Sequence, residues 1–195
     1  CLMDSNGYLA FRKNGPPLMR RVQGDHDLRL DGISDLLSRA RGLSVFDIGC
    51  NRGKAGEDFA RNGASRVFGC DIDEPCIWVC RENFADMRAM PHRFEVVDLA
   101  GGEAALRKAF GKDADLKHDI VLMLATYHKL KRIMAASDLS KLMQFFGSKT
   151  AKCFGWRGYE DEIKSIDADL GKVGLTRIHT SMISDIQPAA IWARR

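Results

Sequence analysis

The chain has 195 residues, of which 45% are hydrophobic, and this size and composition are typical of one globular domain with a full core. Its formal net charge of +4 is mildly basic and does not by itself require a nucleic-acid partner. No apolar stretch reaches the roughly 18 residues needed to cross a bilayer, so we expect no membrane partner.

The cysteines and the first residues bear on the compartment. Residues 1–4 lack the basic region and apolar core of a secretory signal. None of the six cysteines forms a Cys-x-x-Cys pair, and no pair of histidines supplies further metal ligands at a suitable spacing. We therefore expect reduced structural cysteines, no metal site and a cytoplasmic protein.

The first 42 residues are predicted to form a leader with a lid helix, followed by a single domain over residues 43–195. Residues 7–24 contain the sequence Gly15-Pro16-Pro17 and little periodicity, which predicts a loop. Apolar residues recur at spacings of three and four up to Ala40, and Gly42 follows them. This pattern predicts a helix over residues 31–40.

Short apolar runs then alternate with helical patterns. The predicted strands cover residues 43–48, 66–70, 93–97, 118–125, 150–154, 175–180 and 189–193. The predicted helices cover residues 54–62, 74–85, 103–110, 131–146 and 160–170. Such alternation predicts a doubly wound α/β fold, with a mostly parallel seven-stranded sheet and helices on both faces. Residues 181–188 are too few for a crossover, so the last two strands should pair antiparallel and leave a terminal antiparallel strand.

A glycine-containing turn follows the first strand and opens a helix. Its sequence is Asp47-Ile48-Gly49-Cys50-Asn51-Arg52-Gly53. The two glycines allow a tight turn and a close approach to a ligand. The helix start leaves free N–H groups and a positive dipole end. Asp47 ends the strand, where its carboxylate can accept a hydrogen bond from a cationic amine.

Two further acids end the next two strands. Asp71 lies 22 residues after Gly49, and an acidic side chain at this position can bind both hydroxyls of a ribose. Asp98 ends the third strand, where it could reach an adenine amino group. Because open α/β sheets bind ligands at the carboxyl ends of their strands, the three acids should line one crevice.

This set of residues resembles the class I S-adenosylmethionine-dependent methyltransferases, in which an acidic-x-Gly-x-Gly-x-Gly loop and further strand-terminal acids recur. Asn51 replaces the middle glycine here, and Asn tolerates the left-handed backbone that such a turn needs. The resemblance covers residues 43–195 and implies S-adenosylmethionine as cofactor and S-adenosylhomocysteine as product. The implied cofactor contacts are Asp47, Gly49, Cys50, Asn51, Gly53, Asp71, Ile72, Asp98, Leu99 and Leu124.

Other nucleotide-binding interpretations fit less well. The loop has Gly-x-x-x-Gly spacing in place of the Gly-x-Gly-x-x-Gly of NAD-binding folds. The sequence Arg52-Gly53-Lys54 lacks the Gly-Lys-Ser/Thr of a phosphate-binding Walker loop. A domain of the same fold that uses these turns only for folding, or that binds the cofactor without catalysis, stays an alternative.

The acceptor side of the predicted site depends on the segment after the fourth strand. Within the family resemblance, this segment faces the transferred methyl group. His128 could act as a general base, and Tyr127 could pack against the sulfonium or a substrate ring. The alternatives are a surface histidine at a helix start and a tyrosine of the core. Lys129 and Arg29 are candidates for substrate binding, and Arg29 could alternatively bind the methionine carboxylate or lie in an ordinary helix cap.

The methyl acceptor itself is not identified by any motif. The Asn/Asp-Pro-Pro-Tyr box of amino methyltransferases is missing at residues 125–128. The tetrad of ribose 2′-O enzymes also fails, because Lys152 has no acid at the end of the fourth strand to pair with. A small molecule and an RNA both stay open, the latter because of the basic segment 127–132. In either case we expect direct in-line displacement, with the protein holding donor and acceptor in line.

Overall fold

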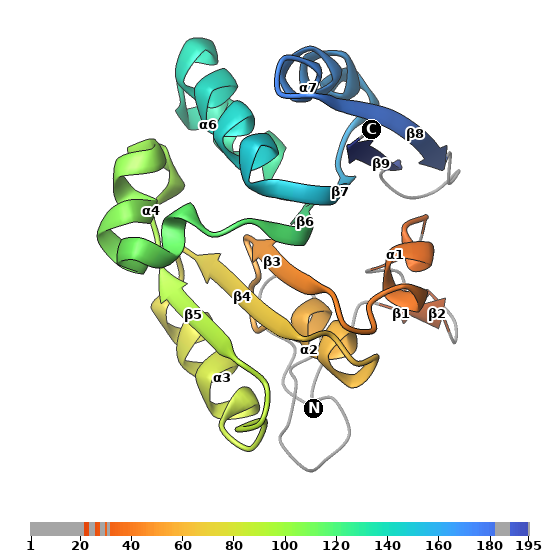
Figure 1. Ribbon diagram of the computed structural model, residues 1–195. Helices are drawn as coiled ribbons and strands as arrows, with labels where there is room; N and C mark the ends of the chain where they lie inside the picture. The colour runs from red at the N-terminus through yellow and green to blue at the C-terminus, as the bar shows by residue number, and fades with distance from the viewer. Residues whose placement is uncertain (1–21, 24–25, 28–29, 31, 182–187, 195) are drawn as a thin grey trace.

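The computed structural model of the protein describes residues 22–23, 26–27, 30, 32–181 and 188–194, and its centre is a seven-stranded sheet (Figure 1). The strands have the order β5-β4-β3-β6-β7-β9-β8. Their bounds are β3 Ser44–Ile48, β4 Arg66–Asp71, β5 His92–Val96, β6 His118–Leu124, β7 Thr150–Arg157, β8 Leu175–Ser181 and β9 Ala189–Arg194.

The sheet is parallel except for one strand. Neighbouring strands from β5 to β7 pair in parallel, whereas β9 pairs antiparallel with both β7 and β8. The strand order reverses direction between β3 and β6, because the chain first builds outward to β5 and then returns to the other side of β3. The predicted doubly wound sheet with an antiparallel terminal strand is confirmed, and β3/β6 is the topological switch point at which such folds bind ligands.

Helices cover both faces of the sheet, and the sheet separates the hydrophobic core into two clusters. The helices are α1 Ser34–Ser38, α2 Lys54–Arg61, α3 Glu74–Phe84, α4 Gly102–Phe110, α5 Tyr127–Ile133, α6 Ala136–Lys149 and α7 Ile163–Gly171. Buried residues of α1, α2 and α3 pack on one face together with Val45, and those of α4, α6 and α7 pack on the other together with Phe46. Adjacent residues of β3 therefore point to opposite faces, as the two-residue period of a strand requires.

The end of β7 differs from the prediction. The strand was predicted to end at Phe154, but β7 continues to Arg157 and Gly155 pairs with Leu122 of β6. A Cβ at Gly155 would lie 2.7 Å from Cδ1 of Leu36. This glycine allows α1 to pack closely against the sheet and does not interrupt the strand. The longer strand carries Arg157 to the carboxyl edge of the sheet.

The predicted helix over residues 131–146 is wrong in its bounds. The structure has two helices there, α5 and α6, separated by Met134 and Ala135 in extended conformation with ψ of 148° and 143°. Neither residue is a glycine or proline, so the sequence carries no signal for the break. The predicted bounds also missed the helix start at Tyr127, although threonine is a common N-cap residue. The Thr126 hydroxyl does not cap α5 and lies 3.3 Å from both Ile48 O and Leu124 O.

The leader is only partly described. Val22–Gln23 and His26–Asp27 form a short antiparallel pair, β1 and β2, so the loop predicted for residues 7–24 is wrong at its end and otherwise lies outside the described residues. Helix α1 is shorter than the predicted 31–40. The apolar spacing continues beyond it through turns with i to i−3 hydrogen bonds, such as Ala40 N to Leu37 O at 3.1 Å.

No helix in the described part of the chain is both long and apolar enough to cross a lipid bilayer.

Candidate functional site

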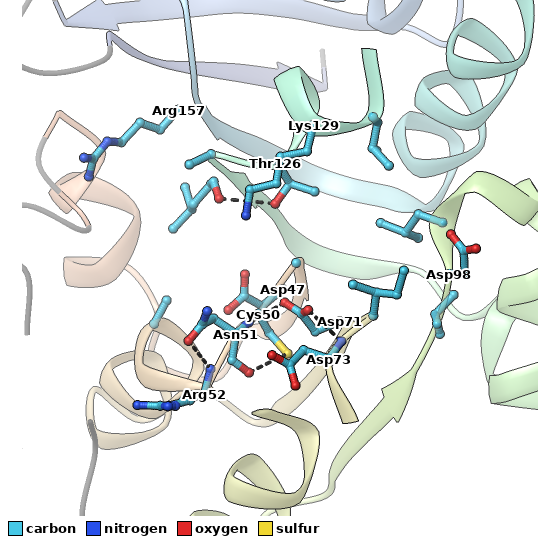
Figure 2. Close-up of a pocket in the computed structure, with 18 of the residues that line it drawn as sticks. Asp47, Cys50, Asn51, Arg52, Asp71, Asp73, Asp98, Thr126, Lys129 and Arg157 are labelled. Carbon is cyan, nitrogen blue, oxygen red and sulfur yellow. Dashed lines mark hydrogen bonds between the residues drawn. The ribbon is translucent and has the colours of Figure 1, made fainter. Parts of the chain in front are cut away.

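A cavity of about 340 Å³ opens at the carboxyl ends of β3, β4, β6 and β7 (Figure 2). Every residue predicted to contact a cofactor lines this cavity except Gly53. The complete lining is Asp47, Gly49, Cys50, Asn51, Arg52, Lys54, Ala55, Asp71, Ile72, Asp73, Val97, Asp98, Leu99, Leu124, Ala125, Thr126, Lys129, Leu130, Ile133 and Arg157.

The turn after β3 is built from left-handed residues. Gly49, Asn51 and Gly53 have φ of 73°, 50° and 75°. The prediction that Asn51 sustains the turn in place of glycine is confirmed, and its side-chain oxygen accepts a hydrogen bond from Arg52 N at 2.8 Å. Gly53 has a packing role behind the cavity, because a Cβ there would lie 2.9 Å from Sγ of Cys80.

Asp47 lies at the end of β3 and is almost inaccessible, with 2% of its surface exposed. Burial, and secondarily the nearby carboxylate of Asp71, raises the pKa of Asp47 to about 7. A carboxylate in this environment is poorly solvated and gains from a cationic partner. The cavity therefore offers a site for an ammonium or similar cation next to Asp47.

Asp71 connects the end of β4 to the glycine turn. Its Oδ2 accepts a hydrogen bond from Asn51 N at 2.8 Å, and its Oδ1 accepts one from Asp73 N at 3.1 Å. Each oxygen of an ionised carboxylate can accept two hydrogen bonds, so one position on each oxygen is left for a ligand. Asp71 is thus held in a fixed orientation while it can still accept two hydroxyl donors.

Two other acids of the lining cap the starts of helices. Oδ1 of Asp98 accepts a hydrogen bond from Ala100 N at 3.0 Å at the start of η2 Leu99–Gly101. Asp73 caps α3 by accepting a hydrogen bond from Cys76 N at 3.4 Å. Both side chains are exposed and lie along the same wall as Asp71 (Figure 2).

Two cysteines lie directly beneath the turn. Cys50 and Cys80 are free thiols whose sulfur atoms are 4.0 Å apart, and Cys80 Sγ donates a hydrogen bond to Asn51 O at 3.1 Å. Hydrogen bonding to Cys80, together with burial, raises the pKa of Cys50. Within the described residues, no three His, Cys, Asp or Glu side chains are grouped so that they could hold a metal ion.

The opposite wall starts with a strained residue. Ala125 follows β6 with φ of 55°, and its N–H donates to Arg157 O at 2.8 Å. A left-handed alanine costs roughly 1 kcal/mol or more, and such strain is found most often at functional sites. The resulting bend lays Thr126 across Gly49, where any added Cβ would overlap the Thr126 hydroxyl.

Helix α5 continues this wall from Tyr127. Lys129, Leu130 and Ile133 line the cavity, and substrate binding by Lys129 stays a prediction. Figure 2 shows the Lys129 side chain extending from α5 into the cavity beside Thr126. Arg157 lies on the same side of the cavity, at the end of β7.

The structure does not bring Tyr127 and His128 to the cavity lining. Tyr127 is 4% exposed and belongs to the core cluster beneath α5. His128 packs edge-on against Tyr159, with ring centroids 5.0 Å apart, and its pKa is lowered by burial and by its neighbours Lys129 and Arg132. These positions favour packing roles, and a catalytic role for either residue stays a prediction. Arg29 lies outside the described residues.

Sequence reasoning missed several residues of the lining. Arg52, Lys54, Asp73, Val97, Thr126 and Leu130 each adjoin a predicted residue, so adjacency could have found them. Ala55, Ile133 and Arg157 have no predicted neighbour, and the last two depend on the start of α5 and the length of β7.

Comparison with known proteins finds similarity at the level of structure alone. No protein-family model and no curated protein matches the sequence. Magnesium protoporphyrin IX methyltransferase from Synechocystis PCC 6803, solved with bound SAM, is similar with a TM-score of 0.63 and 20% identity, over 85% of this chain and 78% of that one.

Two other solved structures have the same arrangement. The ribosomal protein L11 methylase from Lactobacillus delbrueckii subsp. bulgaricus has a TM-score of 0.58 and 18% identity, covering 82% of this chain and 74% of that one. A TehB-like SAM-dependent methyltransferase from Corynebacterium glutamicum has a TM-score of 0.57 and 16% identity, covering 82% and 87%. The chain therefore has the Rossmann-like fold of the class I S-adenosylmethionine-dependent methyltransferases.

Proposed function

We propose that this chain is an S-adenosylmethionine-dependent methyltransferase that moves a methyl group to a small molecule or an RNA. The observation that carries the proposal is the wall formed by Asp47, the glycine turn and Asp71, with Asp98 farther along. Its donors and acceptors fit the cationic amine, the ribose hydroxyls and the adenine of one ligand. The similar structure solved with bound SAM supports the same ligand here.

Each residue of this wall has a defined part in binding. Asp47 accepts the amino group of the methionine portion, which lowers the free energy of its otherwise poorly solvated carboxylate. Asp71, held by Asn51 N and Asp73 N, accepts the ribose hydroxyls with its remaining positions. Asp98 reaches toward the adenine amino group, and Ile72, Leu99 and Val97 provide apolar contacts beside it.

Catalysis requires little more than alignment, because the cofactor supplies a methyl group already activated by the sulfonium charge. The protein holds the acceptor against the wall of Thr126 and α5, in line with the methyl group. A base would be needed only for an acceptor that must lose a proton. Among the described residues that line the cavity there is no histidine.

Calorimetry with S-adenosylmethionine and S-adenosylhomocysteine tests this function. We expect the parent to bind both, and Asp71→Ala to lose at least about tenfold, or about 1.4 kcal/mol. Asp138→Ala is the matched control, because Asp138 is an exposed acid on α6 that pairs with Lys141. Because Asp71 also fixes the turn, the thermal unfolding of each variant should be measured alongside. Equal affinity of parent and Asp71→Ala would contradict the ribose assignment.

A screen for methyl transfer then separates an enzyme from a cofactor-binding protein of the same fold. We expect S-adenosylhomocysteine to accumulate when the parent is incubated with S-adenosylmethionine and a broad set of acceptors. Cofactor binding without turnover on any acceptor would favour the non-catalytic alternative.

A further inference from the structure

The two walls of the cavity carry opposite charges. Asp47, Asp71, Asp73 and Asp98 belong to the wall made by the ends of β3, β4 and β5 (Figure 2). Arg52 and Lys54 also line this wall, so its acids outnumber its cations by four to two. The opposite wall, formed by the end of β7 and by α5, contributes two cations and no acid to the lining within the described residues. If the acidic wall takes the cationic cofactor, the basic wall is left for the acceptor.

Lys129 is the more accessible of these two cations. It is exposed, and within the described part of the chain no hydrogen bond or ion pair engages its ammonium group. Lys131, two residues later, pairs instead with Asp161 at 2.7 Å on a different side of α5. Lys129 and Lys131 of the basic segment 127–132 therefore point to different sides of α5, and Lys129 is the one that extends into the cavity (Figure 2).

Arg157 lies on the same wall, but its side chain runs away from Lys129 (Figure 2). Only 5% of its surface is exposed, although arginine is rarely buried to this extent. Its position at the end of β7 results from the extension of that strand through Gly155.

Apolar side chains lie between and beside these cations. Ile133 is one turn beyond Lys129 on the same face of α5, and it is 65% exposed although it lines the cavity. Leu130 and Leu124 line the cavity next to it. An exposed isoleucine at the mouth of a charged cavity provides a contact for an apolar part of a ligand.

We propose that the methyl acceptor is a small amphipathic anion, with a carboxylate or phosphate bound by Lys129 and an apolar body resting on Leu130 and Ile133. This inference rests on the proposed function and specifies its substrate class. An RNA fits less well, because Lys131 on the outer side of α5 is already neutralised by Asp161.

The test uses simple anions as probes on the full chain saturated with S-adenosylhomocysteine. Benzoate and phenyl phosphate carry an anionic group on an apolar ring, and benzamide is the neutral counterpart of benzoate. We expect millimolar binding of at least one anion and binding at least about fivefold weaker for benzamide, as measured by ligand-observed NMR. Comparison of the two anions distinguishes a carboxylate from a phosphate acceptor.

Variants assign the effect to a residue. Lys129→Met, which keeps the length of the side chain, should weaken binding of the preferred anion at least about fivefold, and Lys129→Arg should retain most of it. Lys131→Met is the matched control and should leave anion binding within about twofold of the parent. The affinity for S-adenosylhomocysteine should be unchanged in all three variants.

The possible failures are distinguishable. If the parent does not bind S-adenosylhomocysteine, the proposed function fails and the inference with it. If the parent does bind S-adenosylhomocysteine, two results would overturn the inference and leave the proposed function standing. Neither anion would bind more tightly than benzamide, or Lys129→Met would bind the anions as tightly as the parent does. Loss of S-adenosylhomocysteine affinity in Lys129→Met would assign this lysine to the methionine carboxylate and overturn the inference. Preferential, steeply salt-dependent binding of a uridine oligonucleotide would overturn it in favour of RNA.

Discussion

The two walls of the cavity differ in how they are built. The wall of β3, β4 and β5 uses glycine turns and strand-terminal acids whose backbone and side-chain geometry follow local rules. The wall of β7 and α5 depends on a strained alanine, a strand that continues through a glycine and a helix without a side-chain cap. We propose the first wall as the cofactor site (the cofactor wall) and the second as the part that binds this protein's own acceptor (the acceptor wall).

The largest effect is expected where the two walls touch, at Gly49. Gly49→Ala puts a side chain at φ of 73° and into overlap with the Thr126 hydroxyl. We expect the free energy of unfolding to fall by about 3 kcal/mol or more, because backbone strain and steric overlap add. Binding of S-adenosylhomocysteine should weaken strongly, because the turn must move. Chemical denaturation and calorimetry measure the two effects.

Gly42→Ala is the matched control. Gly42 also has a positive φ, of 75°, but within the described part of the chain no atom is found within 4 Å of the added Cβ. This variant should therefore lose only about 1 to 2 kcal/mol of stability from backbone strain. Equal destabilisation by the two substitutions would show that the contact between Gly49 and Thr126 adds nothing to the loss of stability in Gly49→Ala.

The acidity of the cofactor wall predicts a pH dependence of binding. The pKa of Asp47 is raised to about 7, so in the unliganded protein this carboxyl takes up a proton as the pH falls below that value. Binding to the ionised form should therefore weaken by about a hundredfold from about pH 8 to about pH 5. Calorimetry across this range checks it, and Asp47→Asn should bind weakly with a flat profile.

The raised pKa of Asp47 also affects the stability of the unliganded fold. Low pH favours this stability, whereas it weakens ligand binding. Because the folded pKa of Asp47 lies above the unfolded value, the folded protein binds the proton more tightly. This group therefore stabilises the unliganded fold below about pH 4, and that contribution is lost as the pH rises through about 7. An Asp47→Asn variant that showed the parent's pH dependence of binding would contradict the assignment.

A smaller effect is expected on the acceptor wall, at Ala125. Glycine adopts φ of 55° without the penalty that alanine pays, so Ala125→Gly should raise the free energy of unfolding by about 0.5 to 1 kcal/mol. Ala109→Gly, within α4, should instead lower it by about 1 kcal/mol. Thermal denaturation compares the two. Destabilisation by Ala125→Gly would show that Ala125 is not strained.

The cofactor wall could be predicted because each of its features has a local cause. An acid at a strand end, a glycine or asparagine in a tight turn and the spacing from Gly49 to Asp71 are all visible in one stretch of sequence. The order of alternating strands and helices likewise predicted the sheet, since each buried run has its own period.

The acceptor wall could not be predicted because its causes are tertiary. Gly155 continues the strand because it pairs with Leu122 of β6 and Ile191 of β9. The N–H of Ala125 donates to Arg157 O, and the next residue, Thr126, packs against Gly49. Tyr127 and His128 follow the fourth strand in sequence, as the family resemblance required. The direction in which α5 leaves that strand carries Lys129, and not these two residues, into the lining of the cavity.

A crystal structure of the chain with S-adenosylhomocysteine tests the division of the cavity most directly. We predict the ribose hydroxyls at Asp71, the amino group at Asp47, and the sulfur atom directed toward the wall of Thr126 and Lys129. A ligand bound elsewhere, or one whose sulfur faces away from α5, would contradict the assignment of the two walls.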